Sequence, residues 1–176
     1  MFALGIDPGL SRCGYGAVRD DGGRLGAVAV GHLSTDPDAP LAERLGILLG
    51  DLEGLLTDLR PEVVVVERVL FQVNVRTAMS VGQASGLALA VAARRGIPVA
   101  QYSPNEVKQA VVGYGSATKD QVQRMVQTLL GLREVPRPAD RADALALAIC
   151  HLSAARLHRA TDAAIAGTGA GGGGAR

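Results

Sequence analysis

Four acidic residues stand at positions from which their carboxylates could act together. Asp7 ends a short apolar run that a Pro-Gly turn closes, and Glu67 ends a run of four valines. Asp140 and Asp143 are three residues apart near the start of the last predicted helix, which puts both on one face of it. If the two strand ends and this helix start meet at one sheet edge, four carboxylates converge. Such a cluster requires protons or divalent cations, because unpaired buried charges are too costly.

Oxygen ligands without His or Cys select hard ions such as Mg²⁺ or Mn²⁺. A pair of such ions activates water and stabilises the leaving oxygen in phosphodiester hydrolysis. Each acid also has an ordinary structural interpretation. Asp7 could be only a turn residue, and Glu67, beside Arg68, could be only the last residue of a strand. Asp140 fits a helix N-cap and Asp143 a first-turn acid, so the spacing alone leaves both interpretations open.

The charges divide the chain into an acidic and a basic part, although the net charge is only +1. Residues 1–67 hold five Arg against eleven Asp and Glu, a balance of −6. Residues 68–137 hold seven Arg and two Lys against three acids, a balance of +6. The basic part favours an anionic partner, which cations could bridge to the acidic part. The alternative is an uneven but merely solvated surface.

Lys108 and Lys119 are the only lysines in the chain, against sixteen arginines. Lys108 lies early in a predicted helix, and Lys119 follows the glycine turn at 113–116, where the next helix begins. A helix N-terminus offers backbone N–H groups to a phosphate, and a lysine adds a point charge. The segment therefore predicts that these two lysines bind a phosphate backbone. The alternative is that both lysines are merely solvated. It lacks the Gly and Lys spacing of a nucleotide-binding P-loop.

The apolar periodicity of the chain predicts the elements that must position these residues. We expect an α/β fold, with a mixed five-stranded sheet flanked by helices on both sides. The predicted strands are Phe2–Asp7, Gly14–Val18, Leu25–Leu33, Val63–Glu67 and Ile97–Tyr102. The predicted helices are Leu41–Leu59, Val75–Arg95, one that begins with a capping box at Ser103, Lys119–Leu130 and Ala139–His158.

The second predicted helix carries a ridge of small residues at a spacing of four. The ridge consists of Ala78, Gly82, Gly86 and Ala90. Residues this small let another element pack very close to the helix. That element is either a strand or helix of the same chain or part of a second subunit, and the sequence leaves both open.

Length and composition indicate one folded domain over residues 1–158 and a disordered Gly/Ala-rich tail over 159–176. Apolar residues make up 48% and charged residues 20%, which excludes a chain that is disordered throughout. No apolar run is long enough to span a bilayer, and no basic leader precedes the first strand. Cys13 and Cys150 lack metal-finger or disulfide spacing and indicate a reducing compartment. We therefore expect a cytoplasmic protein with no membrane partner.

Five motifs resemble, in order and spacing, the RuvC family of Holliday junction resolvases. They are GIDPG with GYG following, the strand end ERV with Leu70, Phe71 and Asn74, GQA with Gly86, VKQAVVGYGSATK at 107–119, and ADRADALALAICH at 139–151. The resemblance extends over residues 2–155. GIDPG alone would be a weak signal, whereas five motifs in order are specific.

The resemblance implies an RNase H-like fold, a homodimer, and Mg²⁺-dependent symmetric nicking of four-way DNA junctions during recombination and repair, which leaves 5′-phosphate ends. The family's catalytic and metal-binding carboxylates fall on Asp7, Glu67, Asp140 and Asp143, which would share two Mg²⁺ ions, with Mn²⁺ as a substitute. The positions that we expect to contact DNA are Arg68, Leu70, Phe71, Asn74, Arg76, Lys108, Ser116 and Lys119. The resemblance also implies a RuvA–RuvB branch-migration complex as a partner.

One position departs from the family pattern. Where the family commonly has an aromatic residue shortly after the strand-end Glu, this chain has Leu70, with an aromatic residue next to it as Phe71. Phe71 could stack on an unpaired base, and Leu70 could wedge between bases. Core packing is the alternative for Phe71.

Two functions of other classes are the alternatives to a junction nuclease. One is a non-catalytic junction-binding module, in which the four carboxylates are only structural. The other is an actin-like phosphotransfer fold, because GIDPG also resembles the first phosphate loop of sugar kinases. That fold needs a second lobe, for which 176 residues leave no room.

Overall fold

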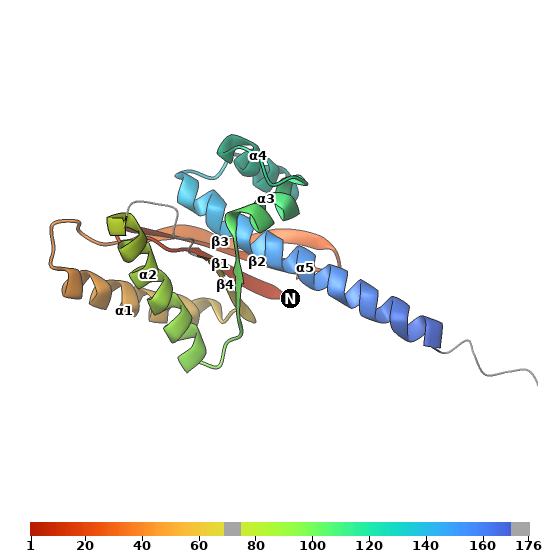
Figure 1. Ribbon diagram of the computed structural model, residues 1–176, viewed down its shortest axis with the longest axis horizontal. Coiled ribbons are helices and arrows are strands. Elements are labelled where there is room, and N and C mark those ends of the chain that lie inside the picture. The colour runs from red at the N-terminus through yellow and green to blue at the C-terminus, as the bar shows by residue number, and fades with distance from the viewer. Residues whose placement is uncertain (69–74, 170–176) are drawn as a thin grey trace, which may run out of the picture.

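The computed structural model describes residues 1–68 and 75–169 (Figure 1). The elements are, in chain order, β1 (Phe2–Asp7), β2 (Arg12–Asp21), β3 (Arg24–Ser34), α1 (Leu41–Leu59), β4 (Val63–Glu67), α2 (Val75–Arg94), β5 (Val99–Tyr102), α3 (Pro104–Val112), α4 (Lys119–Leu130) and α5 (Ala139–Gly169). None of these helices is both long and apolar enough to cross a bilayer.

The strands form one mixed sheet in the order β3-β2-β1-β4-β5. β1 pairs antiparallel with β2 and parallel with β4, so the first strand of the chain lies at the centre of the sheet. β2 continues into β3 through a tight turn at Gly22 and Gly23, both of which have positive φ angles that glycine adopts without strain. All five predicted strands are present, and the predicted mixed α/β sheet is confirmed.

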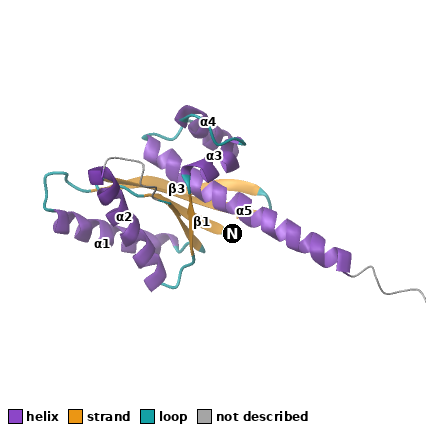
Figure 2. Ribbon diagram, viewed as in Figure 1, coloured by secondary structure: helices purple, strands orange, loops and turns teal. Residues whose placement is uncertain are grey.

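Helices cover both faces of the sheet (Figure 2). On one face, α1 and α2 pack over a core to which β1 contributes Leu4 and Ile6. On the other face, α5 lies across β1 and β2, and α3 and α4 pack against it. Ala3 of β1 belongs to this second core. The alternation of side chains along a strand thus supplies both cores from one central strand.

α5 rests on the backbone of the sheet at three glycines. Gly5 of β1 and Gly16 of β2 are directly opposite each other, and Gly14 lies two residues before Gly16. A Cβ added at Gly5 would overlap the carbonyl oxygen of Ala144, and one added at Gly14 would overlap that of Asp140. We call these three residues the glycine seat. The seat sets the height of the first turns of α5 above the sheet, and these turns carry two candidate carboxylates.

The predicted helix bounds agree with the structure to within one residue, except at the end of α5. α1 and α4 begin and end at the predicted residues, and α3 begins with the predicted capping box. α5 continues to Gly169 instead of ending at His158. Residues 159–169 are therefore not the disordered tail that their composition predicted, because alanine is the strongest helix former and extends the helix beyond the sheet. Residues 170–176 lie outside the described residues.

The small-residue ridge of α2 faces solvent in the chain as described. Gly82, Gly86 and Ala90 are exposed, and a Cβ added at either glycine would meet no described atom within 4 Å. Ala84 and Ala88 form the face of α2 that packs on the sheet. The interpretation of the ridge as a contact within the chain is therefore wrong for the described residues, and its role as a contact with a second subunit stays a prediction.

Candidate active site

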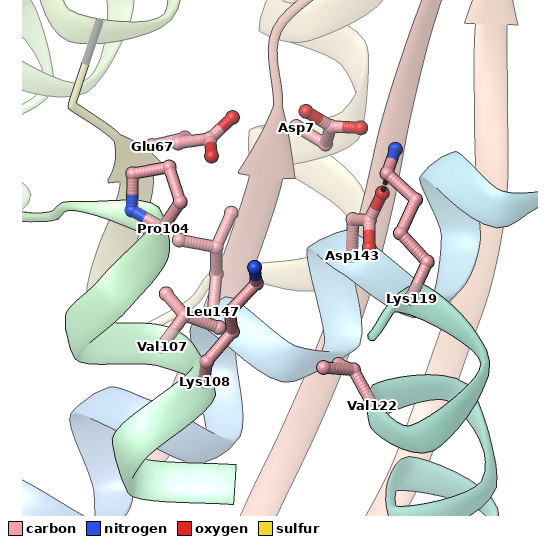
Figure 3. Close-up of a pocket in the computed structure, with 9 residues that line it drawn as sticks. All are labelled: Asp7, Glu67, Pro104, Val107, Lys108, Lys119, Val122, Asp143 and Leu147. Carbon is pink, nitrogen blue, oxygen red and sulfur yellow. Dashed lines mark ion pairs between the residues drawn. The ribbon is translucent and has the colours of Figure 1, made fainter. Parts of the chain in front are cut away.

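A pocket of about 180 Å³ opens where β1 and β4 end (Figure 3). The side chains of Asp7, Glu67 and Asp143 enter it, together with those of Lys108 and Lys119. The apolar part of its lining consists of Pro104, Val107, Val122 and Leu147. The pocket thus gathers three of the four predicted carboxylates and both lysines of the chain.

The parallel pairing of β1 with β4 brings Asp7 and Glu67 to the same sheet edge. Ile6 is the partner of Val66 in the register, so the next residue of each strand is one of the two acids. The valines of β4 are buried, as expected for a parallel strand that is covered on both faces. Asp143 approaches from α5 and points into the same pocket (Figure 3).

Burial and mutual repulsion raise the pKa values of the pocket acids. Burial is the largest cause for Asp7, and the charges of Asp143, Glu67 and Asp140 add to it, so that the pKa of Asp7 rises from 3.8 to about 7. Burial likewise raises the pKa of Glu67 and that of Asp143. The ammonium group of Lys119 acts against these effects and lowers the pKa of all three acids. The pocket holds three acids against two lysines, so the formal charges do not balance when all three acids are ionised.

The two lysines come from helices that pack against α5. Lys108 is half-buried on α3, and Lys119 is the first residue of α4, where the side chain of Thr118 caps the helix. The Nζ of Lys119 lies 3.8 Å from Oδ2 of Asp143, with 78% of the lysine side chain exposed. The ammonium group thus remains accessible to an anion that enters the pocket. Ser116 is exposed in the loop before α4 and does not line the pocket.

Asp140 does not line the pocket, contrary to the expectation that four carboxylates converge. Its side chain is 14% exposed, and its Oδ2 lies 3.7 Å from Nε of Arg12. Its Oδ1 accepts a hydrogen bond of 3.2 Å from the backbone N–H of Arg141. The physical reason is the position of Asp140 on α5, where the helix backbone lies against Gly14 of β2. Asp140 still acts on the pocket, because its charge raises the pKa of Asp7.

Arg68, a predicted DNA contact, directly follows the strand-end acid. Its backbone N–H donates to the carbonyl oxygen of Tyr102 at 2.8 Å, and its Nη2 donates to that of Gln101 at 3.1 Å. Its Nη1 lies 3.8 Å from Oε2 of Glu106. About half of the side chain is exposed, at 52%. Arg68 is therefore anchored to β5 and α3 while its guanidinium remains accessible.

The other predicted DNA contacts fall in or next to the segment between β4 and α2. Leu70, Phe71 and Asn74 lie outside the described residues, and so does the side chain of Arg76. Stacking by Phe71, wedging by Leu70, and contacts by Asn74 and Arg76 therefore stay predictions.

The chemistry of the donors fits a hard divalent cation. Within residues 1–68 and 75–169, no group of three or more His, Cys, Asp or Glu side chains is arranged so that it could hold a metal ion. Asp7, Glu67 and Asp143 nevertheless offer oxygen atoms only, and a cation beside them would offset the burial and the mutual repulsion that raise their pKa values. Oδ2 of Asp140 is buried without a hydrogen-bond partner among the described residues, so this oxygen is one further possible metal ligand beside the pocket.

Comparison with known proteins assigns the family. Residues 3–151 match the family model described as crossover junction endodeoxyribonuclease RuvC. The chain belongs to the RuvC family. The RuvC endodeoxyribonuclease of Chloroflexus aggregans is 53% identical, over 86% of this chain and 92% of its own. That of Frankia casuarinae is also 53% identical, over 86% of this chain and 89% of its own.

Solved structures support the same assignment. Thermus thermophilus RuvC in complex with a Holliday junction substrate is 40% identical, with a TM-score of 0.85, over 90% of this chain and 96% of its own. The yeast mitochondrial Holliday junction resolvase Ydc2 is 15% identical, with a TM-score of 0.61, and shares the fold. The expected RNase H-like fold is confirmed. The expected function is confirmed for this RuvC-family chain as that of an endonuclease that resolves Holliday junctions in DNA recombination and repair.

Sequence reasoning missed two features of this RuvC-family site. The first is the ion pair of Arg12 with Asp140, for which the sequence offers no signal because the two residues are far apart in the chain. The second is the glycine seat. Its signal was present, since Gly14 and Gly16 stand two residues apart on a predicted strand, and glycine in a strand often marks the close approach of another backbone.

Proposed function

We propose that this chain hydrolyses one phosphodiester bond in each of two opposed strands of a four-way DNA junction, with the pocket of Asp7, Glu67 and Asp143 as its catalytic centre and Mg²⁺ as its cofactor. The observation that carries the proposal is the convergence of three acids on one pocket, where burial, with the charges of the neighbouring acids added to it, raises the pKa of Asp7 to about 7. Two lysines lie beside these acids. A divalent cation balances the acids, and a phosphate group balances the lysines.

The carboxylates of Asp7, Glu67 and Asp143 would hold the divalent cation, with Asp140 as a fourth donor from the edge of the pocket. Two Mg²⁺ ions, or Mn²⁺ in their place, would supply an activated water and neutralise charge on the leaving oxygen, and hydrolysis would leave 5′-phosphate and 3′-hydroxyl ends. The charge of Lys119 lowers the pKa values of the three acids and so helps to keep them ionised.

The cations around the pocket would hold the DNA backbone. Lys108 and Lys119 point into the pocket, and Arg68 lies next to Glu67 with its guanidinium accessible. Ser116 would donate its hydroxyl to a phosphate from the exposed loop before α4. Contacts of this kind neutralise phosphates and release counterions, so affinity for the junction should fall as salt is added.

A symmetric dimer would cut both strands. A four-way junction presents two equivalent opposed strands, and a homodimer with a two-fold axis presents two identical sites. The exposed ridge of Gly82, Gly86 and Ala90 supports α2 as a contact between subunits, because helices approach closely where side chains are small. The RuvA–RuvB branch-migration complex is the further partner that we propose. We also propose that the protein acts in the cytoplasm, on junctions that form in genomic DNA.

The proposal is tested by incubating the protein with a mobile four-way junction and with a linear duplex of the same sequence, each in Mg²⁺ and in chelator. We expect paired nicks at symmetric positions of two opposed strands, on the junction alone and only with Mg²⁺. Binding of the junction without nicks in either Mg²⁺ or Mn²⁺ would favour the non-catalytic module instead.

Two variants make this test specific for the pocket. Asp7→Asn should keep its affinity for the junction and lose cleavage by about 1,000-fold or more, because it removes a metal ligand and an activating charge. Asp51→Asn changes an exposed acid on α1 in the same way and should cleave like the wild type. Cleavage by Asp7→Asn at the wild-type rate would contradict the role of Asp7.

A further inference from the structure

Asp140 is the one candidate metal ligand that already has a cationic partner outside the pocket. Its Oδ2 is buried and has no hydrogen-bond partner among the described residues. The cation paired with that oxygen is the guanidinium of Arg12, whose Nε lies 3.7 Å away. This separation is longer than the 2.7–2.9 Å, roughly, of a charge-assisted hydrogen bond, so the pair is held by charge and not by directed bonds.

The backbone of Arg12 is fixed, whereas its side chain is not. Gly9 packs so closely on the carbonyl group of Arg12 that a Cβ at Gly9 would overlap it. The preceding loop is anchored as well, because the hydroxyl of Thr35 donates to the carbonyl oxygen of Leu10 at 2.7 Å. The Arg12 side chain, in contrast, is 57% exposed. The guanidinium can therefore leave Asp140 by side-chain rotation alone.

The neighbouring arginine does not take the same role. Nη2 of Arg141 lies 3.2 Å from Nδ1 of His32 on β3, and its Nε is buried without a hydrogen-bond partner among the described residues. The guanidinium of Arg141 thus contacts β3, whereas its backbone N–H donates to the Asp140 carboxylate. Arg12 is the side-chain cation that neutralises Asp140.

We infer that Arg12 is a displaceable counter-ion, which neutralises Asp140 when no divalent cation is bound and competes with that cation for the same carboxylate. The inference rests on the proposed function, because it assumes that the pocket takes a divalent cation. Entry of the cation repels Arg12 and gives Asp140 a stronger partner. The freed guanidinium then remains at the edge of the pocket, on the side of β2, where it can meet the DNA backbone.

The inference is tested by measuring Mn²⁺ binding to the full chain by calorimetry without DNA. Arg12→Gln should bind Mn²⁺ about fivefold more tightly than the wild type, which is the scale of a partly exposed ion pair. The gain should disappear in the Asp140→Asn background, where Arg12→Gln should leave Mn²⁺ affinity unchanged. The amide oxygen that Asp140→Asn introduces can still accept the N–H of Arg141, so the helix start is preserved.

A matched control and a folding control complete the design. Arg124→Gln removes another arginine from an ion pair, that with Asp120 on the exposed side of α4, and should not change Mn²⁺ affinity. Thermal unfolding in chelator checks that each variant is folded. Unchanged or weaker Mn²⁺ binding by folded Arg12→Gln overturns the inference, and so does a gain of the same size in the Asp140→Asn background. Absence of Mn²⁺ binding by the wild type would instead contradict the proposed function.

Discussion

Ionisation of Asp7 destabilises the metal-free fold. The pKa of Asp7 in the folded chain is about 7, whereas an exposed aspartate has an ordinary value of 3.8. Between these two pH values the folded chain retains a proton that the unfolded chain releases. The free energy of unfolding therefore falls as the pH rises from about 4 to about 7, and it is constant with respect to this group above that range.

Asp7→Asn should therefore stabilise the metal-free protein at pH 8, by roughly 2–4 kcal/mol, because the pKa difference is about three units and each unit corresponds to about 1.4 kcal/mol. The gain should shrink as the pH is lowered toward 4. Urea unfolding in chelator at several pH values measures it. A stability difference that does not vary with pH would show that Asp7 does not titrate in this range.

Lys119 should control the pH at which the pocket becomes active. Its charge lowers the pKa of Asp7, Glu67 and Asp143, so Lys119→Gln raises all three and leaves fewer ionised ligands at a given pH. The acidic limb of the cleavage profile should shift to higher pH, with about a tenfold loss of rate near pH 6 and a smaller loss near pH 9. Arg124→Gln, farther along α4, should leave the profile in place. An equal loss at every pH would assign Lys119 to DNA contact alone.

The pocket acids could be predicted from the sequence, but the direction of Asp140 could not. Asp7 and Glu67 follow apolar runs that form adjacent parallel strands, so their position at one sheet edge follows from the strand pattern. Asp140 and Asp143 share a helix face only approximately, since three residues leave two side chains about 60° apart. This angle is enough for Asp143 to enter the pocket while Asp140 pairs with Arg12.

At the scale of elements, the glycine seat determines how α5 meets the sheet. Helices on sheets are usually separated from the strands by a layer of side chains. Here Gly5, Gly14 and Gly16 remove that layer at the centre of the β1–β2 pair. The close approach allows a carboxylate on the first turns of α5 to reach the strand ends.

Gly5→Ala should displace α5 from the sheet, because the added methyl group would overlap the carbonyl oxygen of Ala144, which is backbone and cannot rotate away. We expect a loss of about 3 kcal/mol or more in stability, measured by chemical unfolding. Gly26→Ala on β3 is the matched control, since a Cβ there would meet no described atom within 4 Å, and it should change stability by about 0.5 kcal/mol or less. Equal losses of stability in the two variants would contradict the role of the glycine seat in positioning α5.

Helix starts were easier to predict than the end of α5. α3 and α4 both begin with a capping box, in which a side-chain oxygen accepts the backbone N–H of the third helical residue. Residues 159–166 contain no glycine or proline to end a helix, so the helix continues where packing alone would have ended it. The prediction failed there because it grouped residues 159–166 with the Gly/Ala-rich end of the chain and took their composition as a sign of disorder.

At the scale of the whole molecule, α5 connects the pocket to the far end of the sheet. Its 31 residues extend for about 46 Å. Near the middle, Arg156 donates two hydrogen bonds of 2.7 Å to the buried carboxylate of Asp20 on β2. The same carboxylate accepts the N–H of Gly23 at 2.9 Å in the β2–β3 turn. Hydrogen bonds from Arg156 hold the pKa of Asp20 well below its ordinary range.

Asp20→Asn should lower stability at pH 7 by about 2 kcal/mol, because it replaces two charge-assisted hydrogen bonds in a buried setting. A depressed pKa stabilises the fold above the ordinary value of 3.8, so the difference from the wild type should shrink as the pH falls below about 4. Thermal unfolding across this range provides the test. Asp21→Asn, at the exposed neighbouring position, should have little effect at any pH.

The division of charge along the chain has a spatial counterpart at the pocket. Asp7 and Glu67 come from the acidic part of the sequence, and Lys108 and Lys119 come from the basic part. The fold places these two acids and two lysines around one cavity. The sequence predicted an anionic partner from this division, but only the packing of α3 and α4 on α5 shows where the two parts meet.

The direct contact of α5 with the strands also determines which backbone amides exchange with solvent last. Between Gly5 and Ala144 there is no room for a side chain, and hence none for a water molecule. The amide hydrogens of β1 and of the α5 turns above it should exchange only when the whole domain unfolds. Their exchange rates would then report the global stability directly, and a divalent cation that binds the folded pocket should slow them all by the same factor.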